Sequence, residues 1–263
     1  MKKPFSSRGQ PLEIDMSHPL QKAFAPIVSY LSRLDPFAYL DRDKRALIDF
    51  AFQRFGLRSF ADLGGVWNVA GGYTFYTLEK FGIEKAFLVD TDFTDEVHKR
   101  ASSYPSLQLI QGNFGNTETI AEIGSVDAVM FFDTLLHQVN PDWDKVLELY
   151  ASKAKHFLVF NQQFSASEHT VRLFDLGEEE YFRNVPHSRS EAPYNTLFQK
   201  LYEVHPQHQR IYRDIHNVWQ WGITDDDLIV RMKQLGFTMQ FYKNAGRFAQ
   251  LENFENHAFL FSR

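Results

Sequence analysis

Residues 59–92 read SFADLGGVWNVAGGYTFYTLEKFGIEKAFLVDTD, and this stretch decides the expected fold. A short apolar run at 60–63 ends on two glycines, and a helical pattern follows at 73–81. A second apolar run then ends on Asp90. We therefore predict a strand, a glycine-rich turn, a helix and a second strand whose tip carries an acid. This order suits an adenosine ligand, because a helix N-terminus lies beside a carboxylate that can accept hydrogen bonds from ribose hydroxyls.

Glycines at strand-to-helix turns are common, so the remaining strands decide the fold class. Further apolar runs at 107–110, 126–132 and 156–160 alternate with helical patterns at 94–102, 117–123 and from Asn140–Pro141 onward. This alternation predicts a doubly wound α/β fold with a parallel sheet. Two alternating runs near the end, 237–242 and 257–261, predict an antiparallel closing pair. The expected sheet is therefore seven-stranded and mostly parallel, with an antiparallel last strand.

The chain divides into three parts. We expect residues 1–56 to form a helical N-terminal extension, with an exposed arm at 1–18 and helices at 19–34 and 41–55. This extension is expected either to cover the mouth of the cofactor site or to pack on the sheet edge. Residues 57–164 and 223–263 form the core. Residues 165–222 lack a clear strand pattern and are rich in aromatic side chains, so we predict a helical insertion that serves as a substrate lid or a dimer interface.

Composition excludes several classes of function. The 263 residues carry a net charge of −5, which argues against a broad nucleic-acid surface. The chain has no cysteine, so disulfides, cysteine nucleophiles and zinc–thiolate sites are excluded. It shows neither a signal peptide nor a long apolar segment, so we expect a cytoplasmic protein without a membrane partner. The spacing of His205 and His208, with His216 beyond, invites a metal, but Pro206 interrupts a helix there and we predict none.

With these features the chain resembles the class I S-adenosylmethionine-dependent methyltransferases, over about residues 59–164 and 224–263. That family has a seven-stranded sheet with an antiparallel last strand. Its first motif, D-x-G-x-G-x-G, is matched at its start by Asp62, Gly64 and Gly65. The later glycines depart from the motif. Gly72 falls where the last glycine belongs, so the loop that carries Trp67 is about four residues longer.

The resemblance implies S-adenosyl-L-methionine as the cofactor and assigns further contacts to it. Asp90, with the adjacent Thr91, matches the acid that binds the ribose hydroxyls, and Asn113–Phe114 matches the pair that contacts adenine. Asp133 ends the fourth strand, and the segment after it carries His137, as in many small-molecule members of the family. The implied contacts are Asp62, Gly64, Gly65, Trp67, Gly72, Asp90, Thr91, Asn113, Phe114 and Asp133.

Methyl transfer from a sulfonium mainly needs in-line placement of the acceptor, and a hydroxyl acceptor also profits from a base. We predict His137 as that base; the alternative is that it only shapes the pocket. The lid residues expected to hold a small-molecule substrate are Tyr194, Arg210, Arg213, His216 and Trp219. The prediction is a small-molecule methyltransferase, with oxygen favoured as the acceptor atom. The alternatives are a catalytically silent cofactor-binding regulator or scaffold and an NAD(P)-dependent oxidoreductase, although G-x-G-x-x-G is missing.

Overall fold

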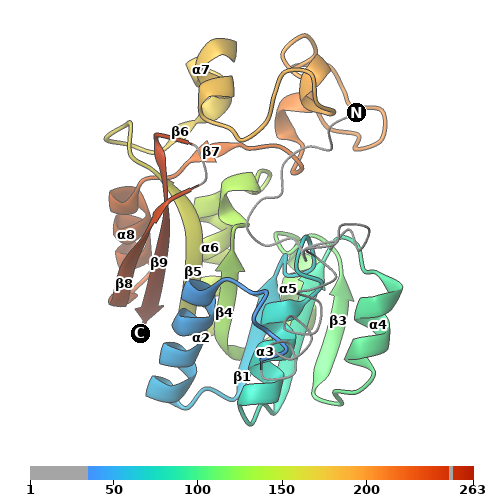
Figure 1. Cartoon of the computed structure of the whole chain (residues 1–263), viewed down its shortest axis with the longest axis vertical. Helices are drawn as coiled ribbons and strands as arrows, with labels where there is room; N and C mark the ends of the chain where they lie inside the picture. The colour runs from blue at the N-terminus through green and yellow to red at the C-terminus, as the bar shows by residue number, and fades with distance from the viewer. Residues whose placement is uncertain (1–34, 249–250) are drawn as a thin grey trace, which may run out of the picture.

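The structure is a computed structural model that describes residues 35–248 and 251–263. The predicted arm at 1–18 and helix at 19–34 lie outside the described residues. One seven-stranded sheet forms the centre of the molecule, in the order β3-β2-β1-β4-β5-β9-β8 (Figure 1). Its strands are β1 (Ser59–Leu63), β2 (Lys85–Asp90), β3 (Leu107–Gln111), β4 (Val126–Phe132), β5 (Ala154–Phe164), β8 (Thr238–Arg247) and β9 (Phe254–Ser262).

The predicted sheet topology is confirmed. Strands β1 to β5 pair in parallel, while β9 pairs antiparallel with both β5 and β8. The last strand is therefore inserted between β5 and β8, and the other six strands run in one direction. Strands β5 and β9 are longer than the sequence pattern predicted, because their polar ends, such as Asn161–Gln163, continue the ladder beyond the apolar run.

Six helices cover the two faces of the sheet. They are α2 (Arg42–Phe55), α3 (Gly72–Lys80), α4 (Asp95–Ala101), α5 (Thr117–Ile123), α6 (Trp143–Ala151) and α8 (Asp225–Gln234). The core residues of α2, α3 and α4 pack on one face, and those of α5, α6 and α8 pack on the other. Side-chain caps fix the helix starts: Asp41, Thr94 and Thr224 accept hydrogen bonds from the first-turn amides of α2, α4 and α8.

One predicted helix start is wrong. The sequence suggested that a helix begins at Asn140–Pro141, but α6 begins at Trp143 with Asp142 as its N-cap. Asn140 has a φ angle of 49°, in the left-handed region, whereas Asp142 has the extended backbone, with φ −71° and ψ 163°, that is typical of an N-cap. The carbonyl of Pro141 instead accepts a hydrogen bond from the Gln138 side chain.

The insertion lies above the carboxyl ends of β3 and β4 (Figure 1) and contains less helix than predicted. Its regular elements are β6 (Val171–Arg172), η2 (Leu173–Leu176), α7 (Glu178–Arg183), η3 (Tyr194–Thr196), η4 (Tyr212–Asp214) and β7 (Trp221–Gly222). Strands β6 and β7 pair antiparallel and hold the two ends of the insertion together. A separate apolar cluster, which includes Phe174, Tyr181 and Trp219, forms its core. In the described part of the chain, no helix is long and apolar enough to cross a bilayer.

Candidate active site

Three acids gather at the carboxyl ends of neighbouring strands. Asp62 lies in β1, Asp90 ends β2, and Asp133 follows β4. Because β1 pairs with both β2 and β4, these strand ends are adjacent. The chain moves outward from β1 in opposite directions, to β2 and β3 on one side and to β4 and β5 on the other. Open α/β sheets bind ligands at this kind of switch point.

The glycine-rich loop closes on itself beside β1. Gly64 has a φ angle of 80°, and a Cβ there would lie 2.7 Å from Thr134 Cγ2, so only glycine fits. The Gly71 amide donates to the Gly65 carbonyl at 3.0 Å. Trp67 is exposed, with 73% of its surface accessible to solvent, so it is not packed into the loop. Gly72 begins α3 and lies against Leu40, which places it beneath the N-terminal extension.

Asp62 is the most deeply buried acid at these strand tips. It is 1% exposed, and its Oδ2 accepts a hydrogen bond from Thr74 Oγ1 at 2.7 Å. Burial, together with the negative charge of Asp90, raises the pKa of Asp62 to about 7, although the hydrogen bond from Thr74 and the charge of Lys44 act in the opposite direction. A Cβ on Gly65 would collide with this carboxyl group. Asp62 therefore supports the glycine loop from below.

Asp90 is tied to the same loop. Its Oδ2 accepts a hydrogen bond from the Val66 amide at 2.9 Å, and its Oδ1 accepts one from the Thr91 amide at 2.7 Å. A carboxylate oxygen has two lone pairs, so each oxygen can still accept a second donor such as a ribose hydroxyl. Thr91 is exposed at the strand end. These two hydrogen bonds hold the Asp90 carboxylate at the end of β2 and fix its orientation.

The predicted adenine contact and the predicted lid meet at the end of β3. Asn113 Nδ2 donates to His216 Nε2 at 3.0 Å, and Arg210 Nη1 donates to the same nitrogen at 2.8 Å. Because Nε2 accepts both bonds, His216 is neutral with its proton on Nδ1. Burial and, after it, the positive charge of Arg210 lower the pKa of His216 to about 4. Phe114 packs edge-on against Phe131 of β4.

His137 lies in the 3-10 helix η1 (Leu135–His137), directly after β4. Its Nδ1 is 2.9 Å from the Val218 carbonyl, which can only accept, so Nδ1 carries the proton and Nε2 keeps its lone pair. Burial lowers the pKa of His137 and keeps the ring neutral near pH 7. Trp219 packs edge-on against this ring at a centroid distance of 6.1 Å. A neutral imidazole with a fixed tautomer is suited to accept a proton.

Asp133 takes part in a contact that sequence reasoning missed. Its Oδ2 forms an ion pair with Lys44 of α2, and its Oδ1 accepts a hydrogen bond from Gln162 Nε2 of β5 at 2.7 Å. Burial would lower the pKa of Lys44, but the carboxylate of Asp133 raises it above the ordinary value. A signal was present in the sequence, since Lys44 occupies the apolar stripe of its helix, three residues before Leu47. The N-terminal extension is thus bonded to the strand tip.

Two predicted substrate residues serve the interior of the insertion instead. Tyr194 is buried and stacks on His187 with ring centroids 4.4 Å apart. Arg213 forms an ion pair with Asp175 at 2.5 Å. Both side chains are engaged within residues 165–222. The structure therefore brings Arg210, His216 and Trp219 toward the strand tips, but not Tyr194 or Arg213.

Two histidines of the insertion, His205 and His208, lie side by side. The rings of His205 and His208 pack on each other with centroids 4.5 Å apart. Across residues 35–248 and 251–263, no group of three His, Cys, Asp or Glu side chains could hold a metal ion.

No protein-family model and no curated protein matches this sequence significantly. Solved structures do share its fold. An O-methyltransferase family protein from Burkholderia thailandensis aligns with a TM-score of 0.52 at 13% identity, over 97% of this chain and 64% of its own length. The 1,6-didemethyltoxoflavin-N1-methyltransferase of the same organism, bound to S-adenosylhomocysteine, aligns at 0.53 and 12% identity, over 96% of this chain and 93% of its own. The N-terminal domain of EvdMO1, crystallised with S-adenosylhomocysteine and D-fucose, aligns with a TM-score of 0.51 at 14% identity, over 84% of this chain and 83% of its own length. The chain therefore has the fold of class I S-adenosylmethionine-dependent methyltransferases.

Proposed function

We propose that this protein is an S-adenosylmethionine-dependent methyltransferase that acts on a small molecule. The observation that carries the proposal is the sheet order, in which β9 is inserted antiparallel between β5 and β8 and the acid-bearing tips of β1, β2 and β4 are adjacent. A dinucleotide oxidoreductase would bind its cofactor at a similar switch point, but the 1,6-didemethyltoxoflavin-N1-methyltransferase structure described above aligns over 96% of this chain.

The residues at the strand tips fit the proposed cofactor. A Cβ at Gly64 would meet the side chains of Thr134 and Phe114, so the backbone of the glycine loop lies close to the residues that follow β3 and β4. Asp90 has spare lone pairs for ribose hydroxyls, and Phe114 offers an apolar surface beside the end of β3. S-adenosylmethionine would supply an activated methyl group. The chain's own part is to position the acceptor in line with that group, an effect that can be worth roughly 7–11 kcal/mol.

We further propose that His137 is the general base. Its Nδ1–H is fixed by the Val218 carbonyl, so Nε2 is free to take the proton of a hydroxyl acceptor. This role favours oxygen over an already nucleophilic nitrogen as the methylated atom. The insertion would choose the substrate through Arg210, His216 and Trp219. A homodimer, a cytoplasmic location and the lack of a nucleic-acid partner stay predictions of the sequence.

The test of the cofactor assignment is calorimetric titration of the protein with S-adenosylhomocysteine and, separately, with NAD. We expect binding of the first only. Asp90→Ala removes both the ribose acceptor and the Val66 tether and should weaken binding, whereas Asp90→Asn keeps one acceptor oxygen and should weaken it less. Binding of NAD, or equal affinity in the wild type and Asp90→Ala, would contradict the proposal.

A second candidate function is cofactor binding without methyl transfer, and the glycine loop is the feature that supports it. This loop is about four residues longer than the family motif, and its Trp67 is 73% exposed. Product analysis with radiolabelled methyl donor and a panel of phenols and sugars separates the two functions, since a silent member would bind the donor and label nothing.

A further inference from the structure

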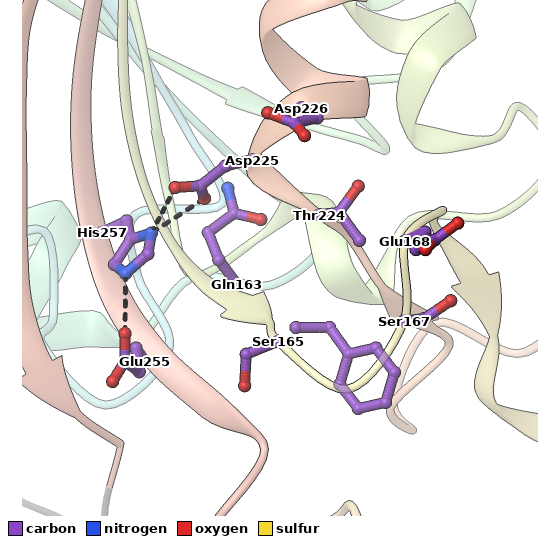
Figure 2. A pocket seen from close by; sticks show the side chains of 10 residues that line it. Gln163, Ser165, Ser167, Glu168, Thr224, Asp225, Asp226, Glu255 and His257 are labelled. Atoms are coloured by element: carbon purple, nitrogen blue, oxygen red, sulfur yellow. Dashed lines mark hydrogen bonds and ion pairs between the residues drawn. The ribbon is translucent and has the colours of Figure 1, made fainter.

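A cavity of about 240 Å³ lies at the root of the insertion, away from the strand tips described above. It is bounded by the end of β5, the first turn of α8 and the start of β9, as Figure 2 shows. Its ten lining residues are Gln163, Phe164, Ser165, Ser167, Glu168, Thr224, Asp225, Asp226, Glu255 and His257. None of them belongs to the candidate cofactor set, so the cavity is a separate feature.

The sheet face that leads to this cavity changes from apolar to polar. In β5, Phe157 and Val159 pack in the core, whereas the next residues on the same face are Asn161 and Gln163. In β9 the corresponding change leads from Phe259 to His257, which lies opposite Asn161. A polar patch at the end of a buried sheet face is costly unless its groups find partners.

Gln163 lacks such partners. It is 2% exposed, it lines the cavity, and neither Nε2 nor Oε1 forms a hydrogen bond within the described residues. The Oδ1 atom of Asn161, two residues earlier on the same face, also has no partner there. Buried amides are almost always hydrogen-bonded, so this pair indicates a partner group that residues 35–248 and 251–263 do not provide.

The charges around the cavity define the missing group. Asp225 Oδ1 and Glu255 Oε2 lie 2.8 Å and 3.3 Å from the two ring nitrogens of His257, so this ring bridges two carboxylates (Figure 2). Glu168 and Asp226 form no ion pair within residues 35–248 and 251–263, and no Lys or Arg lines the cavity. Four carboxylates against one histidine give a negative potential that attracts a cation.

We propose that this cavity is a binding site for a small organic cation that donates N–H hydrogen bonds, such as an alkylammonium or guanidinium group. The Gln163 Oε1 and the carboxylates would accept its N–H groups. A metal ion fits poorly, because the described part of the chain contains no cluster of three metal-ligating side chains. The volume is below the range of about 300–1,000 Å³ that is typical for drug-sized ligands, so the cation is small.

The test uses putrescine as the probe and the uncharged, similarly shaped butanediol as its control, with calorimetry and the shift in melting temperature as readouts. We expect putrescine to bind in the millimolar range or tighter and to raise the melting temperature, while butanediol does neither. Gln163→Leu should weaken putrescine binding by about 10- to 100-fold, because the buried amide contact to a charged donor is lost.

Two further variants keep the test independent of folding. Asp226→Asn changes an exposed residue at the rim and should weaken binding severalfold, whereas Glu84→Gln changes an exposed carboxylate that pairs with Arg58 outside the cavity and should have no effect. Equal responses to putrescine and butanediol, equal weakening by Asp226→Asn and Glu84→Gln, or binding of a divalent cation without binding of putrescine would each overturn the proposal. Binding of S-adenosylhomocysteine is not required for any of these outcomes.

Discussion

The ion pair between Lys44 and Asp133 offers a quantitative test of how the N-terminal extension is attached. The Lys44 side chain is 9% exposed, and its Nζ lies over the rings of Tyr73 and Phe160, at 5.4 Å and 4.9 Å from their centroids. Removing one partner of a fully buried pair costs about 3–5 kcal/mol. Asp133 is 39% exposed and keeps its bond to Gln162, so water offsets part of that loss. The cost of removing Lys44 should therefore lie between the cost for a buried ion pair and the cost for a surface ion pair. We expect Lys44→Met to lower the free energy of unfolding by about 2 kcal/mol.

For a domain of this size, that loss corresponds to a decrease of about 4–8 °C in melting temperature, measured by circular dichroism. Lys145→Met is the matched control, because Lys145 pairs with Glu148 at the surface and is 60% exposed, so its removal should cost no more than about 1 kcal/mol. The double variant Lys44→Met, Asp133→Asn should recover part of the loss, since no carboxylate is left unpaired. Equal destabilisation by Lys44→Met and Lys145→Met would refute the reasoning.

Three further predictions concern titrating groups. The pKa of Asp62 is raised to about 7 from an unfolded value near 3.9, so the free energy of unfolding of the wild type should decrease as pH rises from about 4 to 7. Asp62→Asn should abolish this pH dependence and should be more stable than the wild type by up to about 4 kcal/mol at pH 8. If the free energies of unfolding of the two proteins, measured by chemical denaturation, changed in parallel with pH, the prediction would be contradicted. His137→Gln should reduce turnover about 10²- to 10⁴-fold without changing the affinity for S-adenosylhomocysteine. The control His98→Gln, at an exposed position, should leave both turnover and affinity unchanged. Because the pKa of His137 is lowered, the acid limb of the wild-type pH–turnover profile should lie below pH 6.5. Arg210→Met removes a positive charge beside His216, so the pKa of His216 should rise from about 4, while burial keeps it below 6.5. NMR titration of the imidazole ring measures this pKa. An unchanged pKa would show that Arg210 does not contact His216.

Much of the fold could be predicted because its elements have local signals. The helix at 117–123 and the strand at 126–132 were predicted with the bounds that the structure has, since an apolar run between turn residues specifies them. The order of strands followed from the alternation of patterns and the right-handed crossover rule. The exact start of α6 did not follow, because the left-handed φ angle of Asn140 depends on tertiary contacts that propensities ignore.

The candidate site was predicted less completely, because its contacts join residues far apart in the chain. Asp90 was placed at the crevice, but its bond to the Val66 amide depends on the path of a loop that departs from the family motif. Lys44 and Asp133 are 89 residues apart, and a lysine in a helical pattern is ordinarily a solvated side chain.

The sequence predicted that the aromatic residues of the insertion line a substrate lid or a dimer interface, and that role stays a prediction. The structure shows that several of these residues pack inside the insertion. Phe174 and Tyr181 stack on each other with centroids 4.7 Å apart, and Tyr181 donates its hydroxyl proton to the Trp219 carbonyl. A segment outside the main sheet needs apolar surface to hold itself together, so most of its aromatic side chains are used for its own stability. Composition alone cannot separate that demand from ligand binding.

The pairing of β6 with β7 has a consequence for how such a protein can change its specificity. Val171 is held opposite Gly222, so the two ends of the insertion, which follow β5 and precede α8, lie side by side. The roughly fifty residues between β6 and β7 could therefore be exchanged for another segment without changing how β5 and α8 are placed. Substrate specificity can then be changed, in evolution or by engineering, by replacing this region while the central sheet and its helices stay the same.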